Sequence, residues 1–498
     1  MPLHPFKFAG QYYTERNIQI DNQKTINMYA IKDEYNEDLW TLANLPGLGD
    51  ATTIPNNSPI TTVTPMRGNG LFSHLDHLYE ISGENLYRDG ELIPFIIPGP
   101  SPPPLVPFPS GANVRWTNIP TQIGFCVGSN LYVINITPDA EFTEVTNLPD
   151  NQFDICVLNG RAYVIIKGTN QFYVSDQGDI SKYDPGRYAL FTAAGDTLMG
   201  CASFKSRLFL FGRFSTESWY PSPTVDIPVV RDPNYIFQWG TPATYSIVEG
   251  HDDANNSLLA WLAQDKSGTP SFICTYGVDV ETISNPPIVI LLQNFSELSD
   301  AVGYSYKIDG HLFFEWSFAT ANKTLVYDAT MKAWFTREML NTDRFIGNSH
   351  AYFHGEHYIG SRVDNRLYKM AARYLMYGDE NIHRQRISNI LHSPNLNRRR
   401  VDLIELKFIT GDIPLLSTDP NQLQGTEFVP YAYLSVSRDY QPFDMPRKMS
   451  IGKTGQYRHK TQWRGLGIAY AFCFKLDLYD PIRTYITGCS ISDMEFGS

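Results

Sequence analysis

Short runs of alternating apolar and polar residues, each followed by a turn signal, recur along most of this chain. The clearest example is Asp300–Glu338, where alternating apolar residues lead into Asp309-Gly310, a dipeptide typical of hairpin turns. Further strands are expected over His311–Trp316, Lys323–Asp328 and Ala333–Phe335. Four short antiparallel strands in about 40 residues have the size of one propeller blade. This segment therefore predicts a blade.

The same alternation continues from about residue 61, with Gly, Asn or Asp turns between aromatic strands. Examples are Leu78–Ile81, Asn130–Ile134, Gly160–Ile165, Gln171–Val174, Ser206–Phe211 and Tyr358–Gly360. Strands at this spacing predict a sandwich, a barrel or a propeller. A loose recurrence of roughly 45 to 55 residues favours the propeller, because each four-stranded blade is one such unit. About six blades fit the available length.

The pattern changes near residue 378, where the aromatic alternation stops and an arginine-rich stretch begins. Apolar strands then resume, and we expect them over Val401–Phe408, Ala432–Val436, Gly467–Leu478 and Thr484–Phe496. The sequence thus predicts an all-β protein in three parts. These are an extended N-terminal arm (1–60), a β-propeller (61–378) and a C-terminal β-sandwich-like platform domain (379–498). The proline-rich segment 94–109 is expected to form a stiff surface loop.

Composition agrees with an all-β fold. Aromatic residues make up 13% of the chain and charged residues only 18%, while 36 glycines and 33 prolines supply turns. The formal net charge of −12 argues against tight nucleic-acid binding, although DNA could slide past an acidic wall. The six cysteines form no CxxC pair and lie mostly in apolar runs, which predicts buried free thiols in a reducing compartment. With no signal peptide and no membrane-spanning run, the protein is expected to be soluble.

Few residues suggest chemistry. The pairs His74/His77 and His354/His357 lie in strand-like contexts, where this spacing does not place two side chains on one face, so no metal site is expected. No phosphate-binding loop, dinucleotide fingerprint or nucleophile elbow occurs. A degenerate sialidase-type turn begins at Ser437. We therefore expect no enzymatic activity and no cofactor, and keep as the alternative a propeller that binds or hydrolyses glycans at a host surface.

The arginine cluster is the main candidate for a binding surface. It contains Arg384, Arg386, Arg398, Arg399 and Arg400. Such a run can be a solvated face, a phosphate-binding surface or a subunit contact; in an otherwise acidic chain we favour an interface with an acidic surface of a neighbouring subunit. Trp463 and Arg464, beside a glycine turn, are candidate structural corner residues, with core packing favoured for Trp463.

Several blocks, in order, resemble the packaged-DNA stabilisation proteins, also described as tail hubs or nozzles, of short-tailed bacteriophages. Within 300–338 the pattern is a Gly-His-x-Phe strand followed by Val-Tyr-Asp-x5-Trp. The other blocks are Asn27-Met28-Tyr29, Leu45-Pro46-Gly47, and segments 160–184, 206–220, 261–284, 384–400 and 462–481. The proline-rich loop, and the absence of an Asp-Gly-Gly-x-Thr-Trp turn after Tyr440, depart from the family pattern.

The resemblance implies a structural protein of the virion tail, assembled in the bacterial host cytoplasm. Family members form a six-subunit ring below the portal and its adaptor, continue the DNA channel and close it after packaging. They also support tail fibres, spikes or a needle. The implied partners are thus other copies of the chain, the adaptor, fibre, spike or needle proteins, and double-stranded DNA that passes without sequence-specific contact. Membrane insertion is not implied.

Overall fold

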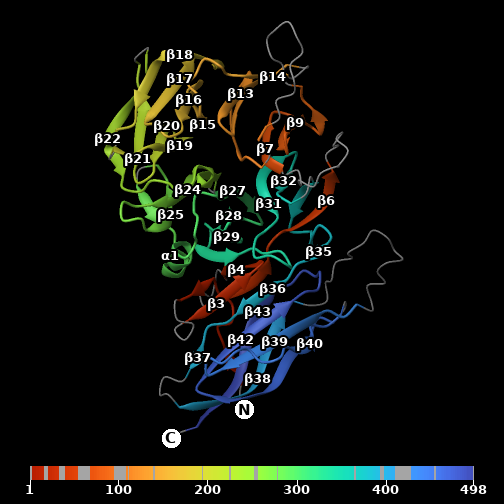
Figure 1. Ribbon diagram of the computed structural model, residues 1–498. Coiled ribbons are helices and arrows are strands. Elements are labelled where there is room, and N and C mark those ends of the chain that lie inside the picture. Colours follow the sequence, from red (N-terminus) through yellow and green to blue (C-terminus); the bar gives the residue numbers. More distant parts are fainter. Residues whose placement is uncertain are drawn as a thin grey trace.

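The computed structural model of the protein describes residues 3–15, 21–32, 40–53, 68–94, 108–109, 111–137, 141–192, 195–223, 226–251, 256–277, 279–363, 366–392, 397–409, 428–453 and 456–496. Regular structure is almost entirely β, and about 3% of the residues are helical. A ring of blades forms one part, and a strand-rich unit lies against one side of its rim (Figure 1). The predicted all-β fold class, a propeller followed by a sandwich, is confirmed.

Five blades of the propeller are separate four-stranded antiparallel sheets. The first contains β7 (Gly68–His74), β8 (His77–Ser82), β9 (Asn85–Arg88) and β10 (Glu91–Leu92). The second contains β11 (Val114–Ile119), β12 (Gln122–Val127), β13 (Asn130–Asn135) and β14 (Glu141–Glu144). The third contains β15 (Gln152–Leu158), β16 (Arg161–Ile166), β17 (Gln171–Asp176) and β18 (Asp179–Leu190).

The fourth blade contains β19 (Leu198–Phe204), β20 (Arg207–Gly212), β21 (Thr216–Pro221) and β22 (Val229–Phe237). A short 3₁₀ turn, η2 (Thr244–Ser246), leads into the fifth, with β23 (Val248–His251), β24 (Ser257–Gln264), β25 (Pro270–Thr275) and β26 (Val280–Thr282). The helix α1 (Pro286–Gln293) follows; Asn285 caps it, and Pro286 and Pro287 occupy its first turn. Among the described residues, no helix is long and apolar enough to cross a membrane.

The sixth blade is the hairpin segment that the sequence pattern predicts most clearly. Its strands are β27 (Ala301–Ile308), β28 (His311–Phe318), β29 (Lys323–Asp328) and β30 (Ala333–Thr336). Asp309 and Gly310 both have positive φ angles, as a two-residue type I′ hairpin turn requires. Every residue of β28 is buried, because the strand packs against neighbouring blades on both faces.

The seventh blade closes the ring with a strand from the beginning of the chain. It consists of β31 (Gly347–Phe353), β32 (Glu356–Ser361), β33 (Arg366–Ala371) and, as fourth strand, β6 (Gly47–Thr53). β31 lies beside β7 of the first blade. The described residues thus form seven blades rather than about six. The length-based count was one too low because it took no strand from the region before residue 61.

The C-terminal domain is a sandwich of two sheets. One has the order β4 (Met28–Lys32), β5 (Trp40–Asn44), β43, β38, β41, with β1 (His4–Pro5) beside β43. The other has the order β3 (Asn22–Ile26), β36, β42, β39, β40, with β2 (Tyr13–Thr14) and β37 at its margins. Its C-terminal strands are β36 (Arg384–Ile387), β37 (Leu391–His392), β38 (Arg398–Phe408), β39 (Tyr431–Arg438), β40 (Arg447–Ser450), β41 (Thr461–Ala469), β42 (Ala471–Leu478) and β43 (Ile486–Phe496). The expected strand Gly467–Leu478 is divided into β41 and β42, with Tyr470 between them.

The described residues of the expected N-terminal arm (1–60) do not form a separate unit in this structure. β1 (His4–Pro5), β2 (Tyr13–Thr14), β3 (Asn22–Ile26), β4 (Met28–Lys32) and β5 (Trp40–Asn44) join the two sandwich sheets, whereas β6 joins the propeller. Of these strands, β3 and β4 lie on the side of the sandwich that faces the ring (Figure 1). Near them, β34 (Met376–Tyr377) pairs with β6 and with β35 (Glu380–Asn381). The first six strands therefore belong to both domains, and the remaining strands of the propeller and the sandwich follow later in the chain.

Two features join the domains into one body. A parallel bridge between Ile26 of β3 and Thr336 of β30 makes the sixth blade and one sandwich sheet a single 11-stranded sheet. The largest hydrophobic cluster also runs from Phe313 and Phe335 in the blade to Phe474 and Trp463 in the sandwich. All six cysteines are buried, as predicted, and none is in a disulfide. The proline-rich segment lies outside the described residues, except Pro94, Phe108 and Pro109.

Candidate assembly site

Two members of the predicted arginine cluster, Arg384 and Arg386, lie inside the molecule. Both belong to β36, which pairs with β3 on one side and β42 on the other. Their exposed fractions are 1% and 0%. This corrects the expectation that they face a neighbouring subunit, because neither side chain reaches the surface of a single chain.

Arg386 holds the N-terminal segment in place. Its guanidinium donates hydrogen bonds to the carbonyl oxygen of Phe8 (2.8 Å), the carbonyl oxygen of Gln11 (3.1 Å) and Oγ1 of Thr25 (2.9 Å). A further bond of 2.5 Å reaches Oε1 of Gln23. Burial without a carboxylate in contact lowers the pKa of Arg386 to about 9, so it remains a cation at neutral pH.

Arg384, the first residue of β36, has a similar role. It donates to the carbonyl oxygens of Leu375 and Asp480, each at 3.2 Å. These partners lie just after the last blade and just after β42, so the side chain joins the connection between the domains to the sandwich. Burial lowers the pKa of Arg384 to about 10. Both arginines thus use backbone carbonyls to fix segments that are distant in sequence.

A buried ion pair lies at the centre of the domain junction. Arg337, which follows β30, donates to Oε2 of Glu315 on β28 at 2.9 Å, and both side chains are fully buried. The same guanidinium donates to the Pro46 carbonyl (2.5 Å) and to the Tyr377 hydroxyl (3.1 Å), and lies 3.6 Å from the ring centre of Phe345. This one side chain therefore contacts the sixth blade, the entry to β6 and the connection to the sandwich.

Tyrosines complete the polar shell of Glu315. The Tyr304 hydroxyl donates to Oε1 at 2.7 Å, and the Tyr306 hydroxyl lies 3.3 Å from Oε2. Burial, reinforced by the Glu315 carboxylate, raises the pKa of both tyrosines well above the usual value. They remain protonated donors, as a buried carboxylate requires.

Asn27, from the Asn-Met-Tyr block, has a left-handed backbone (φ 56°) between β3 and β4. Its amide nitrogen donates to the carbonyl oxygens of Glu338 (2.8 Å) and His383 (2.7 Å). Its amide oxygen accepts from the Glu338 backbone and from the Tyr377 hydroxyl, each at 3.0 Å. Asparagine tolerates this backbone conformation and offers both donors and acceptors. The residue therefore links the propeller to the sandwich, a role that its sequence context alone does not reveal.

The motif in the sixth blade is structural as well. Asp328, the last residue of the Val-Tyr-Asp block, lies 2.7 Å from Nδ1 of His311 and accepts backbone hydrogen bonds from Thr330 and Met331. The aspartate thereby shapes the turn into β30. Trp334 is buried and donates to the Ile283 carbonyl at 2.7 Å, which ties this blade to the preceding one.

Two of the remaining cluster members, Arg398 and Arg400, belong to an exposed sheet face, which we call the arginine face. Arg398 pairs with Phe496, and Arg400 pairs with both Met494 and Ile468 across β43, β38 and β41. Tyr470 lies just beyond Ile468, with the Arg398 guanidinium 5.4 Å from its ring centre. Cross-strand partners point to one face. The arginine face therefore consists of Arg398, Arg400, Ile468, Tyr470, Met494 and Phe496, all of which are exposed.

Arg399 points to the opposite face of the same sheet. It forms ion pairs with Asp493 (2.9 Å) and with Glu495, and its side chain is only 12% exposed. Asp493 also lies 2.6 Å from Nε2 of His4, so this group clips β1 to β43. The strand alternation separates Arg399 from its two neighbours, and we assign it to stability of the sandwich.

The other predicted residues have simpler roles. Trp463 is 2% exposed in the core and donates to the Arg447 carbonyl at 2.7 Å, consistent with the favoured packing role. Arg464 is exposed and donates to Gln462. The degenerate sialidase-type turn lies in the sandwich, at the end of β39, and Asp439 there accepts backbone bonds from Tyr470 and Ala471. It is therefore a turn cap outside the propeller.

The features that would indicate a catalytic site are metal-binding groups and cavities with paired carboxylates. No group of three or more His, Cys, Asp or Glu residues in the described part of the chain could hold a metal ion. His74 and His77 face each other across a turn, and His77 pairs with Asp89 at 2.6 Å. Of three cavities, a 210 Å³ pocket beside β39 and β42 and a 480 Å³ pocket at Gln456–His459 have no lining carboxylate. The third, 580 Å³ beside β1 and β5, has one, Glu405.

Side chains fill the centre of the propeller at the level of Arg115. This residue of the second blade donates to Asp154 of the third blade at 2.9 Å and to the Ile247 carbonyl, just before the fifth blade, at 3.1 Å. Since the second and fifth blades are not neighbours, this contact crosses the middle of the ring. Asp154 also accepts the Cys201 backbone from the fourth blade. These hydrogen bonds hold the second, third, fourth and fifth blades together at the axis of the propeller.

Comparison with known families decides what this architecture is. The sequence models of two successive domains match, one described as bacteriophage P22 Gp10, beta-propeller, over residues 5–374 and one as bacteriophage P22 Gp10, beta-sandwich, over residues 384–493. Together they cover nearly the whole chain. The chain belongs to this family. The resemblance to the phage proteins that stabilise packaged DNA is thus confirmed, and the Gp10 family supports a structural protein of the virion tail.

Solved structures resemble the chain only distantly. The N-terminal domain of Nup159 has a TM-score of 0.39 at 10% identity and covers 70% of this chain and 98% of that one. An extracellular domain of the hybrid two-component system BT4673 from B. thetaiotaomicron has a TM-score of 0.41 at 9% identity, covering 88% and 62%. An exo-β-1,3-galactanase from Phanerochaete chrysosporium scores 0.26 at 11% identity, covering 68% and 95%. Such scores carry no functional argument. No curated protein matches the sequence.

Proposed function

We propose that this Gp10-family chain is a non-enzymatic tail hub or nozzle of a short-tailed phage. In this role, six copies form a ring below the portal and its adaptor, continue the DNA channel, and close it after packaging. The ring also supports fibres, spikes or a needle. The observation that carries the proposal is the match of both domains, in order, to a family that stabilises packaged DNA.

The rigid junction between the domains supports a role in which the subunit resists force. A channel that retains pressurised DNA needs subunits that do not flex between their domains. Here one sheet crosses from blade to sandwich, and Arg337, Arg386 and Asn27 fasten the early chain to both parts. Rigid subunits of this kind suit a ring in which one heterologous contact is repeated by rotation.

The locked propeller axis supports a channel between copies. The Arg115 contacts join the second, third and fifth blades across the centre of the ring, which leaves no passage there for a DNA duplex. DNA that passes this protein must therefore run alongside the subunits. The net charge of −12 suits a wall along which a polyanion slides instead of binding.

The alternative, a glycan-binding or glycan-hydrolysing propeller, has little support in the described residues. Hydrolysis requires two carboxyl groups flanking a bound sugar. The fully buried acid at the domain junction, Glu315, is committed to Arg337 and two tyrosines. The three cavities described above have at most one carboxylate each. The structural role is therefore favoured.

Retention of DNA tests the proposal directly. Heads that are filled with DNA in a host lacking this protein should release their DNA on storage, and purified protein added to them should prevent the release. The readout is the fraction of DNA that becomes sensitive to a nuclease. The Arg337→Met variant, in which the domain junction is weakened, is compared with the wild-type protein in the same assay. Equal DNA release with and without the wild-type protein would contradict the proposal.

A further inference from the structure

The arginine face combines features that are unusual for solvated protein surface. Four of its six side chains are large and apolar, with exposed fractions from 40% for Phe496 to 51% for Ile468. Two arginines lie among them. Aromatic residues, methionine and arginine are the types enriched at protein interfaces. An uncovered sheet face of this composition indicates a contact surface.

The geometry of the arginine face is fixed before any partner arrives. Its residues stand on three hydrogen-bonded strands, and the strand β38 is paired on both sides. Arg398 is placed over the Tyr470 ring, and Nε of Arg400 donates to Asp402 at 2.6 Å. Preorganised side chains lose little entropy on binding. The face therefore suits a specific, repeated contact.

A complementary surface lies at the turn end of the first blade, and we call it the leucine tip. It contains Leu75, Asp76, Asp89 and Glu91, all exposed; Leu75 is 68% exposed and the Asp76 side chain is 96% exposed. Asp89 also pairs with His77, which ties the turn after β9 to the turn after β7. One exposed leucine and three carboxylates match the apolar residues and two arginines of the other surface.

The backbone of Leu75 provides a second observation. This leucine has φ of 52°, a left-handed conformation that non-glycine residues with a branched side chain rarely adopt. The sequence places a large aliphatic residue at a position that glycine or asparagine would fill with less strain. Strained positions that present an exposed side chain are common at functional sites.

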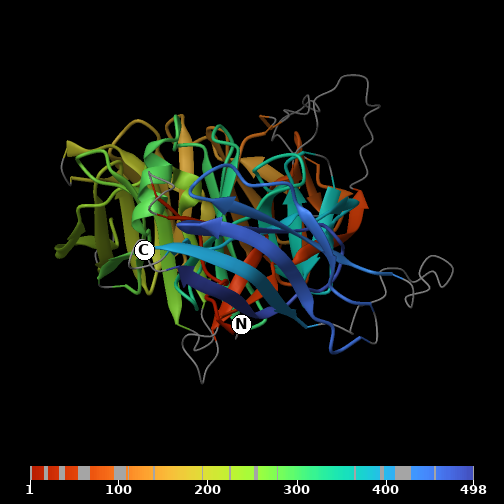
Figure 2. The same cartoon turned by 90° about the horizontal axis from the view of Figure 1, so that it is seen from below.

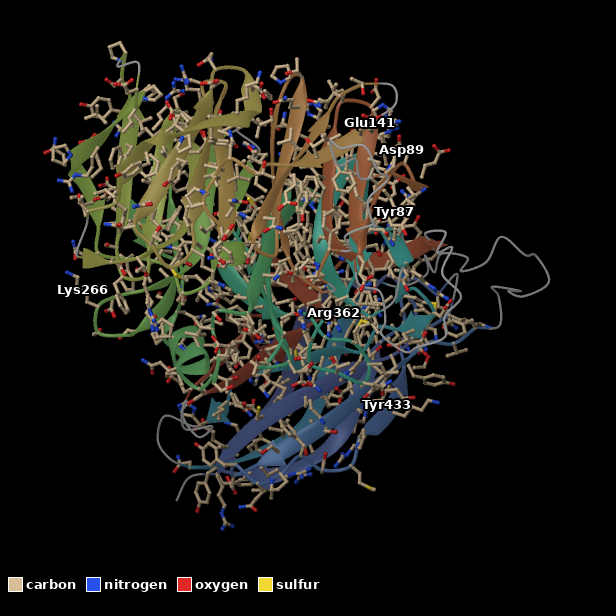
Figure 3. All side chains as sticks on the ribbon, turned by 45° about the horizontal axis from the view of Figure 1, so that its top comes forward. Tyr87, Asp89, Glu141, Lys266, Arg362 and Tyr433 are labelled. Carbon is tan, nitrogen blue, oxygen red and sulfur yellow. The ribbon has the colours of Figure 1, made fainter. Side chains whose placement is uncertain are left out.

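The two surfaces lie at opposite ends of the molecule. In Figure 1 the C-terminus, beside the start of β38, is at the lower left, whereas the first blade is at the upper right. Figure 2 shows the same separation from below. In Figure 3 the labelled Asp89 lies at the outer margin of the first blade, away from the sandwich. Surfaces at opposite ends of one chain can pair only between copies, in a heterologous contact that closes into a ring or continues as a filament.

We infer that the arginine face of one copy docks on the leucine tip of the next copy. This inference rests on the proposed ring and assigns the residues that form its repeated contact. Arg398 and Arg400 face the carboxylates of Asp76 and Glu91, while Phe496, Met494 and Ile468 cover Leu75. The charge pairing sets the register of the contact, and the apolar residues supply its core.

Charge exchange tests the pairing. Self-association of the wild-type chain and its variants is measured by sedimentation velocity over a series of concentrations. Arg398→Glu with Arg400→Glu, or Asp76→Lys with Glu91→Lys, should each weaken the association constant about 10-fold or more. A mixture of these two double variants should restore association, because each provides the surface that matches the other. Mixed species should contain both proteins in equal amounts and alternate along the assembly, since the two reversed surfaces also match each other in charge.

Two further variants separate a specific contact from a general effect of charge. Lys266→Glu with Lys453→Glu makes the same charge change as the arginine double variant, at exposed positions outside both surfaces, and should leave association at the wild-type level. Leu75→Asn suits the left-handed backbone, so it should retain or raise the melting temperature while association weakens.

The outcomes distinguish the inference from the proposal on which it rests. Self-association that survives both charge reversals would overturn the assigned contact and leave the ring intact. A mixture of the two variants that fails to associate would also overturn the pairing of these two surfaces. A wild-type chain that remains monomeric at the highest soluble concentration would overturn the contact together with self-assembly of the ring.

Discussion

The two halves of one arginine-rich segment have opposite environments. Arg384 and Arg386 are enclosed inside the molecule, with backbone carbonyls as their main partners. Arg398 and Arg400, a few residues later, are exposed among apolar side chains. The first pair stabilises one chain, and we assign the second pair to contacts between chains. A run of like charges in a sequence therefore does not define one surface.

The buried arginines also differ in the kind of partner that they contact. Arg337 is paired with a carboxylate, whereas Arg386 contacts only neutral oxygens in the described structure. Breaking an ion pair leaves an uncompensated buried charge; removing Arg386 leaves neutral acceptors unpaired but also removes a buried cation. The effects of substitution should therefore decrease from the junction to the surface.

The largest effect is expected at the junction ion pair. Arg337→Met should lower the free energy of unfolding by about 3–5 kcal/mol, because Glu315 is left buried without its cation. Urea unfolding followed by fluorescence measures the change. The double variant Glu315→Gln with Arg337→Met should lose less than the sum of the two single variants. Additive losses would show that the two side chains do not act as a pair.

A buried acid without a cationic partner, Glu80, should make the stability of the protein depend on pH. Glu80 of β8 is 5% exposed, none of the described residues forms an ion pair with it, and burial raises its pKa from 4.5 to about 8. Between these pH values the folded state binds the proton more tightly than the unfolded state. Stability should therefore fall as pH rises, by up to about 1.4 kcal/mol per pH unit.

The control for this pH dependence is Glu80→Gln, which keeps the shape of the side chain and removes its titration. Its unfolding free energy should vary less between pH 5 and pH 8 than that of the wild type, and should exceed it at the upper end. Unfolding is measured in urea at fixed ionic strength. Parallel pH profiles of the two proteins would exclude Glu80 as the cause.

A smaller loss is expected where an arginine binds neutral oxygens. Arg386→Met should cost about 2 kcal/mol, because the Phe8, Gln11 and Thr25 oxygens lose their donor while the desolvated cation is also removed. Hydrogen exchange should increase first in 8–11 and 22–26. A stability equal to that of Arg400→Met, the matched exposed variant, would mean that Arg386 does not fasten the N-terminal segment.

The smallest effect is expected at the arginine face. Arg398→Glu with Arg400→Glu should change the unfolding free energy of the monomer by less than about 0.5 kcal/mol, because both side chains are exposed. The melting temperature measured at low concentration, where the chain is monomeric, checks this. A loss comparable to that of Arg386→Met would show that these residues stabilise the sandwich itself.

The sequence predicts those parts of the fold that depend on local signals. The four strands of the sixth blade are placed within one or two residues, because Asp309-Gly310 and the turn at 329–332 mark their ends. The closing strand β6 could not be predicted, since its pairing with β33 joins residues about 320 positions apart and leaves no periodic signal. The seventh blade was missed for that reason.

The candidate site shows the same division. The alternation around Arg398–Arg400 is visible in the sequence, although only the register with Phe496 and Ile468 identifies which residues share a face. Burial of Arg386 depends on contacts with Phe8 and Gln11, more than 370 positions away. For Asn27, the neighbouring sequence can suggest only the left-handed backbone. Its hydrogen-bond partners Glu338 and His383 are more than 300 positions away and could not be predicted.

Single-particle electron microscopy of the purified protein, alone and mixed with the adaptor–portal complex of its phage, tests the central claim most directly. The account predicts closed rings with an axial channel wide enough for duplex DNA, formed between subunits, with the arginine face of each copy against the first blade of the next. Isolated propeller–sandwich units in both samples would contradict it.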